Sequence, residues 1–173
     1  MLALRDEPFA AEQLLNQVDQ AEILRVPVMS AARLEGNQAL AICRCDPGPG
    51  LDLTRDLEIW VRVAWINAEQ PALKLLAGEG IGRFGADGDP CVSAFARDLL
   101  ERNLLPLLPP GRAVTVEPVF PRGRELAQRT SNAAFGVVDG LALIGTQAEV
   151  QRSAAPDQLQ TVLAELKRLA AEP

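Results

Sequence analysis

The run LEIWVRVAWI at residues 57–66 restricts the fold more than any other feature of the chain. Its branched and aromatic residues are typical of a β-strand. Two further strands are predicted before it, at 21–30 and 38–45, with no helix between the three. A doubly wound parallel sheet needs strands and helices in regular alternation, and that alternation is absent here. We therefore predict an α+β fold.

The remaining segments complete a single predicted domain over residues 1–173. Apolar residues recur at helical spacing in four places. The predicted helices are 8–18, 90–104, 123–130 and 156–172, and Asp89 is the expected N-cap of the second. Further strands are predicted at 71–82 and 112–120, and a hairpin at 135–145 that turns at Asp139 and Gly140.

Composition excludes several classes of function. The net charge of −6 disfavours a nucleic-acid partner, which needs a basic face. No stretch approaches the roughly 20 apolar residues that cross a bilayer, and the first residues lack a secretory signal, so we expect a cytoplasmic protein without a membrane partner. The chain contains no histidine, which rules out a Ser-His-Asp triad and any His-bearing metal site within it.

The three cysteines do not predict a metal site either. Cys43 and Cys45 form a C-x-C pair in a predicted strand, where their side chains point to opposite faces. Cys91 makes the count odd, which argues against a disulfide framework. We expect at least two of the three to behave as small buried hydrophobic residues, and we predict no metal ligands.

Three loops do not follow the pattern of a hydrophobic core. The first, CDPGPGLDLT, holds Asp46 and Asp52 on a segment fixed by proline and glycine. The favoured interpretation is a turn whose Asp side chains bond to their own backbone. The alternative is a pair of carboxylates that accept a proton or bind ligand hydroxyls.

The second loop, GEGIGRFG, has glycine at 78, 80, 82 and 85. Such a run implies either a close approach to the backbone or positive φ angles. A wide turn and an anion-binding loop are both compatible with it. The third loop, RTSN at 129–132, follows a short predicted helix and carries three hydrogen-bonding side chains where a ligand could be held.

Together these loops resemble the CbiD family, particularly its cyanobacterial form. The segment FPRGRELAQRTSNAAFGVVDGLALIGTQAEV at 120–150 is similar to the family's LPEGRxLAxRTSNAAFGVVxGLSLLGTxG pattern. The first loop resembles DPGxxxDLT, and the second resembles GGEGIGR. Three motifs in the family's order, across most of residues 20–150, make the resemblance specific.

The resemblance implies a fold, an activity and a methyl donor. The fold is α+β, a mixed β-sheet with packed helices that forms the family's N-terminal domain. The activity is methylation at C-1 of cobalt-precorrin-5B in anaerobic cobalamin biosynthesis, with S-adenosylmethionine as donor and a cobalt-corrinoid tetrapyrrole as substrate. A homo-oligomer stays compatible with the sequence.

For the chemistry, we predict three catalytic carboxylates and a larger binding set. Asp46, Asp52 and Glu79 are the candidate bases. Arg83, Arg124 and Arg129 would hold substrate carboxylates. Thr130, Ser131 and Asn132 would hydrogen-bond to donor or substrate. The motifs add these binding positions: Gly48, Thr54, Gly78, Gly80, Gly82, Gly136, Gly145 and Thr146. We expect Asp46, Gly80 and Asn132 to converge on one cavity.

The chain also departs from the family pattern. The GYTTG-like or GYTLP-like opening is absent, and the third motif ends as TQAEV rather than as a TTGIVEP-like sequence. We therefore expect a fragment that lacks the N-terminal motif and the family's C-terminal α/β region. Two other functions stay open: a truncated, non-catalytic paralogue that binds a tetrapyrrole or a partner protein, and an anion-binding α+β module.

Overall fold

The computed structural model describes residues 1–5, 7–8, 11–16, 23–48, 52–85, 88–143, 163–164 and 166–167. Its centre is a five-stranded sheet in the order β3-β4-β5-β9-β6. The strands are β3 (Ser30–Leu34), β4 (Gln38–Arg44), β5 (Glu58–Asn67), β9 (Arg112–Val119) and β6 (Leu73–Leu75). Within this sheet β6 runs parallel to its neighbour, β9, and the other pairs are antiparallel, so the sheet is mixed, as predicted.

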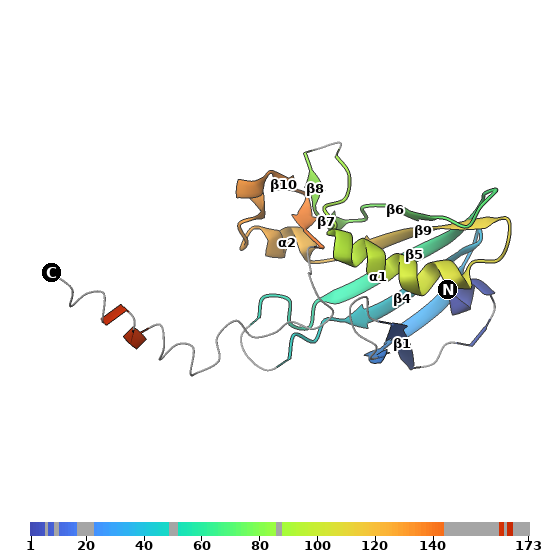
Figure 1. Ribbon diagram of the computed structural model, residues 1–173, viewed down its shortest axis with the longest axis horizontal. Helices are drawn as coiled ribbons and strands as arrows, with labels where there is room; N and C mark the ends of the chain where they lie inside the picture. The colour runs from blue at the N-terminus through green and yellow to red at the C-terminus, as the bar shows by residue number, and fades with distance from the viewer. Residues whose placement is uncertain are drawn as a thin grey trace.

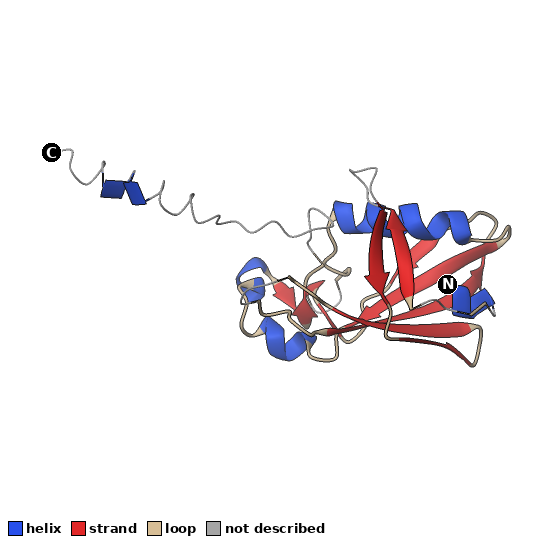
Figure 2. Ribbon diagram, turned by 90° about the horizontal axis from the view of Figure 1, so that it is seen from below, coloured by secondary structure: helices blue, strands red, loops and turns tan. Residues whose placement is uncertain are grey.

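Smaller elements cover one face of this sheet. Helix α1 (Ala94–Leu104) lies across it (Figure 1), and a ribbon of β1 (Glu12–Asn16) and β2 (Ile23–Pro27) reaches the helix at one of its ends (Figure 2). Asn103 on α1 holds the ribbon: its Oδ1 accepts from the Asn16 N–H at 2.8 Å, and its Nδ2 donates to the Asn16 carbonyl at 2.8 Å. The short 3-10 helices η1 (Leu2–Arg5) and η2 (Leu105–Leu107) flank this layer.

A separate group of short elements sits at one end of the sheet (Figure 1). This end group comprises β7 (Gly80–Ile81), β8 (Arg83–Phe84), α2 (Gly123–Ala127), η3 (Asn132–Phe135), β10 (Val137–Val138) and β11 (Gly140–Leu141). β7 pairs with β11 in parallel, and β8 pairs with β10 antiparallel.

Two apolar clusters hold these parts together. The first lies between the sheet and its helical cover, and it includes Val63, Val114 and Val116. The second joins the end group to the sheet through Leu57, Ile81, Phe120, Leu126 and Leu141. Burial of such side chains is the main driving force for folding, so the end group is fixed to the sheet by its own core.

The longest predicted strands are confirmed, whereas the predicted helix at 8–18 and the predicted hairpin are wrong. Residues 12–16 of the predicted helix 8–18 form β1, because their backbone groups pair with β2 in the register Glu12 to Pro27. The predicted hairpin at Asp139 and Gly140 does not form, because β10 and β11 each pair with a strand of the 80–84 segment. Of the predicted strand 21–30, residues 23–27 form β2, which ends at Pro27 in an edge strand, and only Ser30 belongs to β3.

Helix α1 starts later than predicted, and its cap is Ser93 rather than Asp89. The Ser93 Oγ accepts a hydrogen bond from the Ala96 N–H at 3.1 Å, while Ser93 keeps an extended backbone. The predicted helix 156–172 falls almost entirely outside the described residues. Its four described positions, 163–164 and 166–167, are helical.

We expect Ser93→Ala to lower the free energy of unfolding by about 1 kcal/mol, because the first turn of α1 loses its side-chain acceptor. Asp89→Ala is the matched control and should stay within about 0.5 kcal/mol of the parent. Urea denaturation of both variants checks the assignment. An equal loss in the two variants would contradict it.

Candidate functional site

The glycine-rich loop packs against the chain's own backbone. Gly80 has φ of +75°, and a Cβ added there would lie 2.1 Å from the Phe120 carbonyl oxygen. A Cβ at Gly123 or at Gly140 would lie 2.2 Å or 2.0 Å from the Gly80 carbonyl oxygen. Both predicted reasons for the glycines therefore hold, and the group that approaches Gly80 is protein backbone.

A polar hollow of about 380 Å³ opens beside this loop. Charged side chains of both signs line it, together with the loop backbone. Its lining is Ala77, Gly78, Glu79, Gly80, Ile81, Arg83, Glu117, Arg124 and Asp139. The predicted residues Glu79, Arg83 and Arg124 are thus brought together, with two carboxylates that the sequence analysis did not select.

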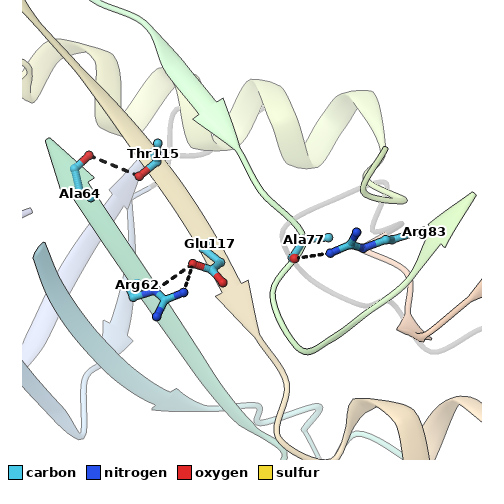
Figure 3. A network of polar contacts seen from close by, with 6 residues as sticks. All are labelled: Arg62, Ala64, Ala77, Arg83, Thr115 and Glu117. Atoms are coloured by element: carbon cyan, nitrogen blue, oxygen red, sulfur yellow. Dashed lines mark hydrogen bonds and ion pairs between the residues drawn. The ribbon is translucent and has the colours of Figure 1, made fainter. Parts of the chain in front are cut away.

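The charged groups of the polar hollow are held by contacts from three elements. Arg83 donates from Nη2 to the Ala77 carbonyl at 2.8 Å (Figure 3). Glu117 on β9 accepts from Nε and Nη2 of Arg62 on β5, at 2.8 and 2.5 Å (Figure 3). Arg124 on α2 lies 3.9 Å from Glu79, with both side chains about two-thirds exposed.

An apolar hollow of about 360 Å³ adjoins the polar one. Its lining is Arg124, Ala127, Gln128, Asn132, Ala133, Val137, Val138, Asp139 and Gly140. Arg124 and Asp139 line both hollows, so the two spaces share a wall. Asp139 holds a positive φ of +67°, which is uncommon outside glycine and directs the chain from β10 into β11.

The RTSN segment positions this second hollow. Thr130 donates from Oγ1 to the Ala127 carbonyl at 2.7 Å and closes the end of α2. Asn132 donates from Nδ2 to the Gly140 carbonyl at 3.2 Å, which ties η3 to β11. Arg129 and Ser131 are exposed beside them. Gly136 caps η3 with φ of +74°.

Asp46 lies at a different hollow, of about 430 Å³, lined by Pro27, Met29, Arg44, Cys45, Asp46, Arg55 and Asp56. Asp46 accepts from the Gly48 N–H at 2.9 Å, and Asp52 accepts from the Thr54 N–H and Oγ1 at 2.7 and 2.6 Å. The favoured interpretation of these Asp residues as turn-forming is confirmed. The expected convergence of Asp46 with Gly80 and Asn132 on one cavity is wrong, because the three residues line three different hollows.

Asp52 is held in its ionised form. The hydrogen bonds from the Thr54 hydroxyl and N–H lower the pKa of its carboxyl below the ordinary value, with a smaller contribution from Arg55. A base that takes a proton near neutral pH needs a raised pKa, so this environment suits a structural role.

We expect Asp52→Ala to lower the free energy of unfolding at neutral pH by about 0.5–1 kcal/mol, a modest loss because the carboxylate is exposed. The folded-state pKa is below the unfolded one, so this stabilisation exists above the ordinary pKa and is lost as pH falls through the lowered pKa. The difference between parent and Asp52→Ala should therefore shrink in acid. An unchanged difference at about pH 2 would contradict it.

Several expected residues have other surroundings or lie outside the described part. Gly78 and Gly82 also face protein atoms, since an added Cβ would meet the Pro118 carbonyl oxygen at 2.4 Å or Val137 Cγ1 at 2.5 Å. Gly48 has φ of +74°, and its carbonyl accepts from Arg55. Gly145 and Thr146 lie outside the described residues.

Sequence reasoning missed Glu117, Asp139 and Gln128. Glu117 follows buried Val114 and Val116 at odd offset in β9, so strand periodicity alone places it on the other face. Asp139 precedes a glycine and was expected to be a hairpin turn.

Among the described residues, no group of three or more His, Cys, Asp or Glu side chains is arranged to hold a metal ion, and no helix is long and apolar enough to span a bilayer.

Comparisons with known proteins agree on one family. The CbiD family profile matches residues 2–152. A cobalt-precorrin-5B C(1)-methyltransferase of Synechococcus sp. strain CC9605 is 73% identical over 98% of this chain, and one of Prochlorococcus marinus strain MIT 9313 is 60% identical over 98%. Each alignment covers 46% of the relative, so the chain spans about half the length of the curated relatives it matches.

A crystal structure of the cobalamin biosynthesis protein CbiD from Archaeoglobus fulgidus has the same fold. The TM-score is 0.61 at 19% identity, over 94% of this chain and 54% of the other. The profile match across most of the chain and the high identity to the cyanobacterial proteins lead to one conclusion: the chain belongs to the CbiD family.

Proposed function

We propose that the protein methylates C-1 of cobalt-precorrin-5B during cobalamin biosynthesis, with S-adenosylmethionine as the methyl donor. This reaction is supported by the relatives of up to 73% identity, which are cobalt-precorrin-5B C(1)-methyltransferases. The cytoplasm stays the predicted location. The structural observation that carries the proposal is the pair of adjoining hollows with Arg124 and Asp139 in their common wall.

Methyl transfer needs two reactants in contact, because the new bond forms as the old one breaks. The C-1 carbon of the macrocycle attacks the donor methyl, the methyl–sulfur bond breaks, and its electron pair stays on sulfur to leave a neutral thioether. The donor is already activated by its positive charge, so the protein contributes chiefly by positioning. Two spaces with one shared wall suit that requirement.

The proposed roles in the reaction are assigned to residues in and beside the two hollows. Glu79 is the proposed base wherever a proton must leave the macrocycle. Arg124 and Arg129 are proposed to hold peripheral carboxylates of the substrate, and Arg83, which lines the polar hollow, is proposed to hold a carboxylate of the donor. Ser131 and Asn132 are proposed hydrogen-bonding groups. Asp46 and Asp52 were predicted as further bases, but their bonds within the loop favour Glu79.

Incubation of the protein with methyl-labelled S-adenosylmethionine and cobalt-precorrin-5B tests the proposal. The parent protein is expected to form a labelled, methylated corrinoid. The Glu79→Ala variant is expected to form no labelled product, although its circular dichroism spectrum should match that of the parent. Corrinoid binding without donor binding would instead select the non-catalytic tetrapyrrole-binding function. Binding of inorganic phosphate alone would select the anion-binding module.

A further inference from the structure

We infer that the two hollows divide the two reactants: the polar hollow takes the methyl donor, and the apolar hollow with the exposed phenyl rings of Phe84 and Phe135 takes one face of the macrocycle. This inference rests on the proposed function and deepens it, because it assigns each reactant to its own residues. Charged side chains distinguish the first hollow, and apolar surface distinguishes the second.

The polar hollow matches the charges of a sulfonium amino acid. S-adenosylmethionine carries a sulfonium, an ammonium and a carboxylate within a few bonds of one another. Glu79, Glu117 and Asp139 offer three carboxylates to the two cations, and Arg83 and Arg124 offer guanidinium groups to the carboxylate. Ala77 accepts one of the five N–H donors of Arg83 and fixes the guanidinium at the edge of the space.

Glu117 is the most firmly held of the three carboxylates. Its side chain is 21% exposed, whereas that of Glu79 is 65% exposed. In addition, Arg62 donates two hydrogen bonds to one oxygen of the Glu117 carboxylate. A carboxylate fixed in this way is already oriented before a ligand arrives, so less ordering is needed on binding. The hollow therefore presents an oriented carboxylate on β9, which is paired with Arg62, and a more exposed carboxylate on the glycine-rich loop.

Two exposed phenyl side chains belong to elements that border the apolar hollow: Phe135 is in η3, and Phe84 is in β8, which pairs with β10. Phe135 is 74% exposed and Phe84 is 58% exposed, while Val138 in the wall of the hollow is 38% exposed. Phe84 pairs with Val137, and the next residues on each strand are joined by the Gly85 N–H and the Gly136 carbonyl at 3.3 Å. Both phenyl groups therefore lie at the same end of the β8–β10 ribbon.

This surface suits a flat ring with charged edges. Exposed aromatic side chains beside a hollow mark binding surfaces more often than chance, because water contact with them is unfavourable. A corrinoid presents an apolar face to such rings and carboxylates at its rim. Arg124 lines the hollow and offers a guanidinium group to that rim, and Arg129 is exposed two residues after Ala127, which also lines the hollow.

The shared wall explains how the reactants would meet. Arg124 and Asp139 line both spaces, so ligands in the two hollows approach each other there. The donor methyl can then face the macrocycle edge without either ligand leaving its site. The C–S bond electrons remain on the donor sulfur, and the methyl carbon becomes bonded to C-1.

Separate binding measurements on the two ligands test the division. Isothermal titration with S-adenosylmethionine measures donor binding, and the absorption change of cobyrinic acid, a cobalt corrinoid with free carboxylates, measures macrocycle binding. Glu79→Gln should weaken donor binding by about five- to tenfold at low salt and leave cobyrinic acid binding unchanged. Phe135→Ser should weaken cobyrinic acid binding by about tenfold and leave donor binding unchanged.

Two control variants match these in chemistry and exposure. Glu35→Gln removes a carboxylate in the turn between β3 and β4, and Leu14→Ser removes an exposed apolar side chain on β1. Neither should change the binding of either ligand. All four positions are exposed, so loss of folding is not expected.

The outcomes separate the inference from the proposed function. Reversed effects, or effects of each variant on both ligands, would overturn the division of the hollows. If Glu79→Gln and Phe135→Ser bind both ligands as the parent does, and the parent transfers the methyl group, the assignment of one reactant to each hollow is overturned and the proposed function stands. If the parent protein binds neither S-adenosylmethionine nor cobyrinic acid, the inference and the proposed function are both overturned.

Discussion

Gly80→Ala is expected to lower the free energy of unfolding by about 3 kcal/mol or more. Two effects add at this position. A left-handed φ of +75° is unfavourable for alanine, and the new Cβ would lie 2.1 Å from the Phe120 carbonyl oxygen. Phe120 cannot move away freely, because its N–H donates to the Glu79 carbonyl at 2.9 Å and its carbonyl accepts from Gly123 at 2.7 Å.

A second glycine separates the two effects. Gly85 has nearly the same φ, +73°, but no atom lies within 4 Å of an added Cβ. Gly85→Ala should therefore lower stability by only about 1 kcal/mol, the conformational part alone. Chemical denaturation of both variants measures the difference. Equal losses would show that the backbone contact between Gly80 and Phe120 does not exist in solution.

Ile81→Ala is expected to lower the free energy of unfolding by about 2–5 kcal/mol. Ile81 is 0% exposed and sits in the cluster with Leu57, Phe120, Leu126 and Leu141. Removing its branched side chain leaves a cavity between the glycine-rich loop, α2 and β11. Because this cluster joins the end group to the sheet, donor binding should be lost together with stability.

Ile81→Val is the graded control for this cavity. It removes one methylene group and should cost about 0.5–1.5 kcal/mol. Thermal and urea denaturation should show stability that decreases from the parent to Ile81→Val and then to Ile81→Ala. A parent-like midpoint for the alanine variant would mean that Ile81 is not buried and that the second cluster is assigned incorrectly.

The long strands were predictable because local pattern and tertiary structure agree there. Residues 57–66 and 112–120 alternate and carry branched side chains, and both became central strands of the sheet. The segment 8–18 failed because its apolar residues allow a helical spacing, whereas pairing with β2 decides its structure. The residues of a segment do not by themselves show which strand it will pair with, even when that strand is the next one in the chain.

The end group could not be predicted for the same reason. Its strands are two residues long, and β7 finds its partner β11 about 60 residues later. The motifs correctly marked Gly80 as constrained, but they did not reveal that Phe120, Gly123 and Gly140 constrain it. Glu117 and Asp139 were missed because a strand position and a presumed hairpin turn gave no reason to select them.

The placement of both reactants at the end group is tested most directly by amide chemical shifts of the isotope-labelled protein. Addition of S-adenosylmethionine should shift the amides of Glu79, Gly80 and Arg83, and addition of cobyrinic acid should shift those of Ala133 and Val138. Asp139, in the shared wall, should respond to both. Shifts confined to the other hollow, around Asp46 and Arg55, would contradict the account.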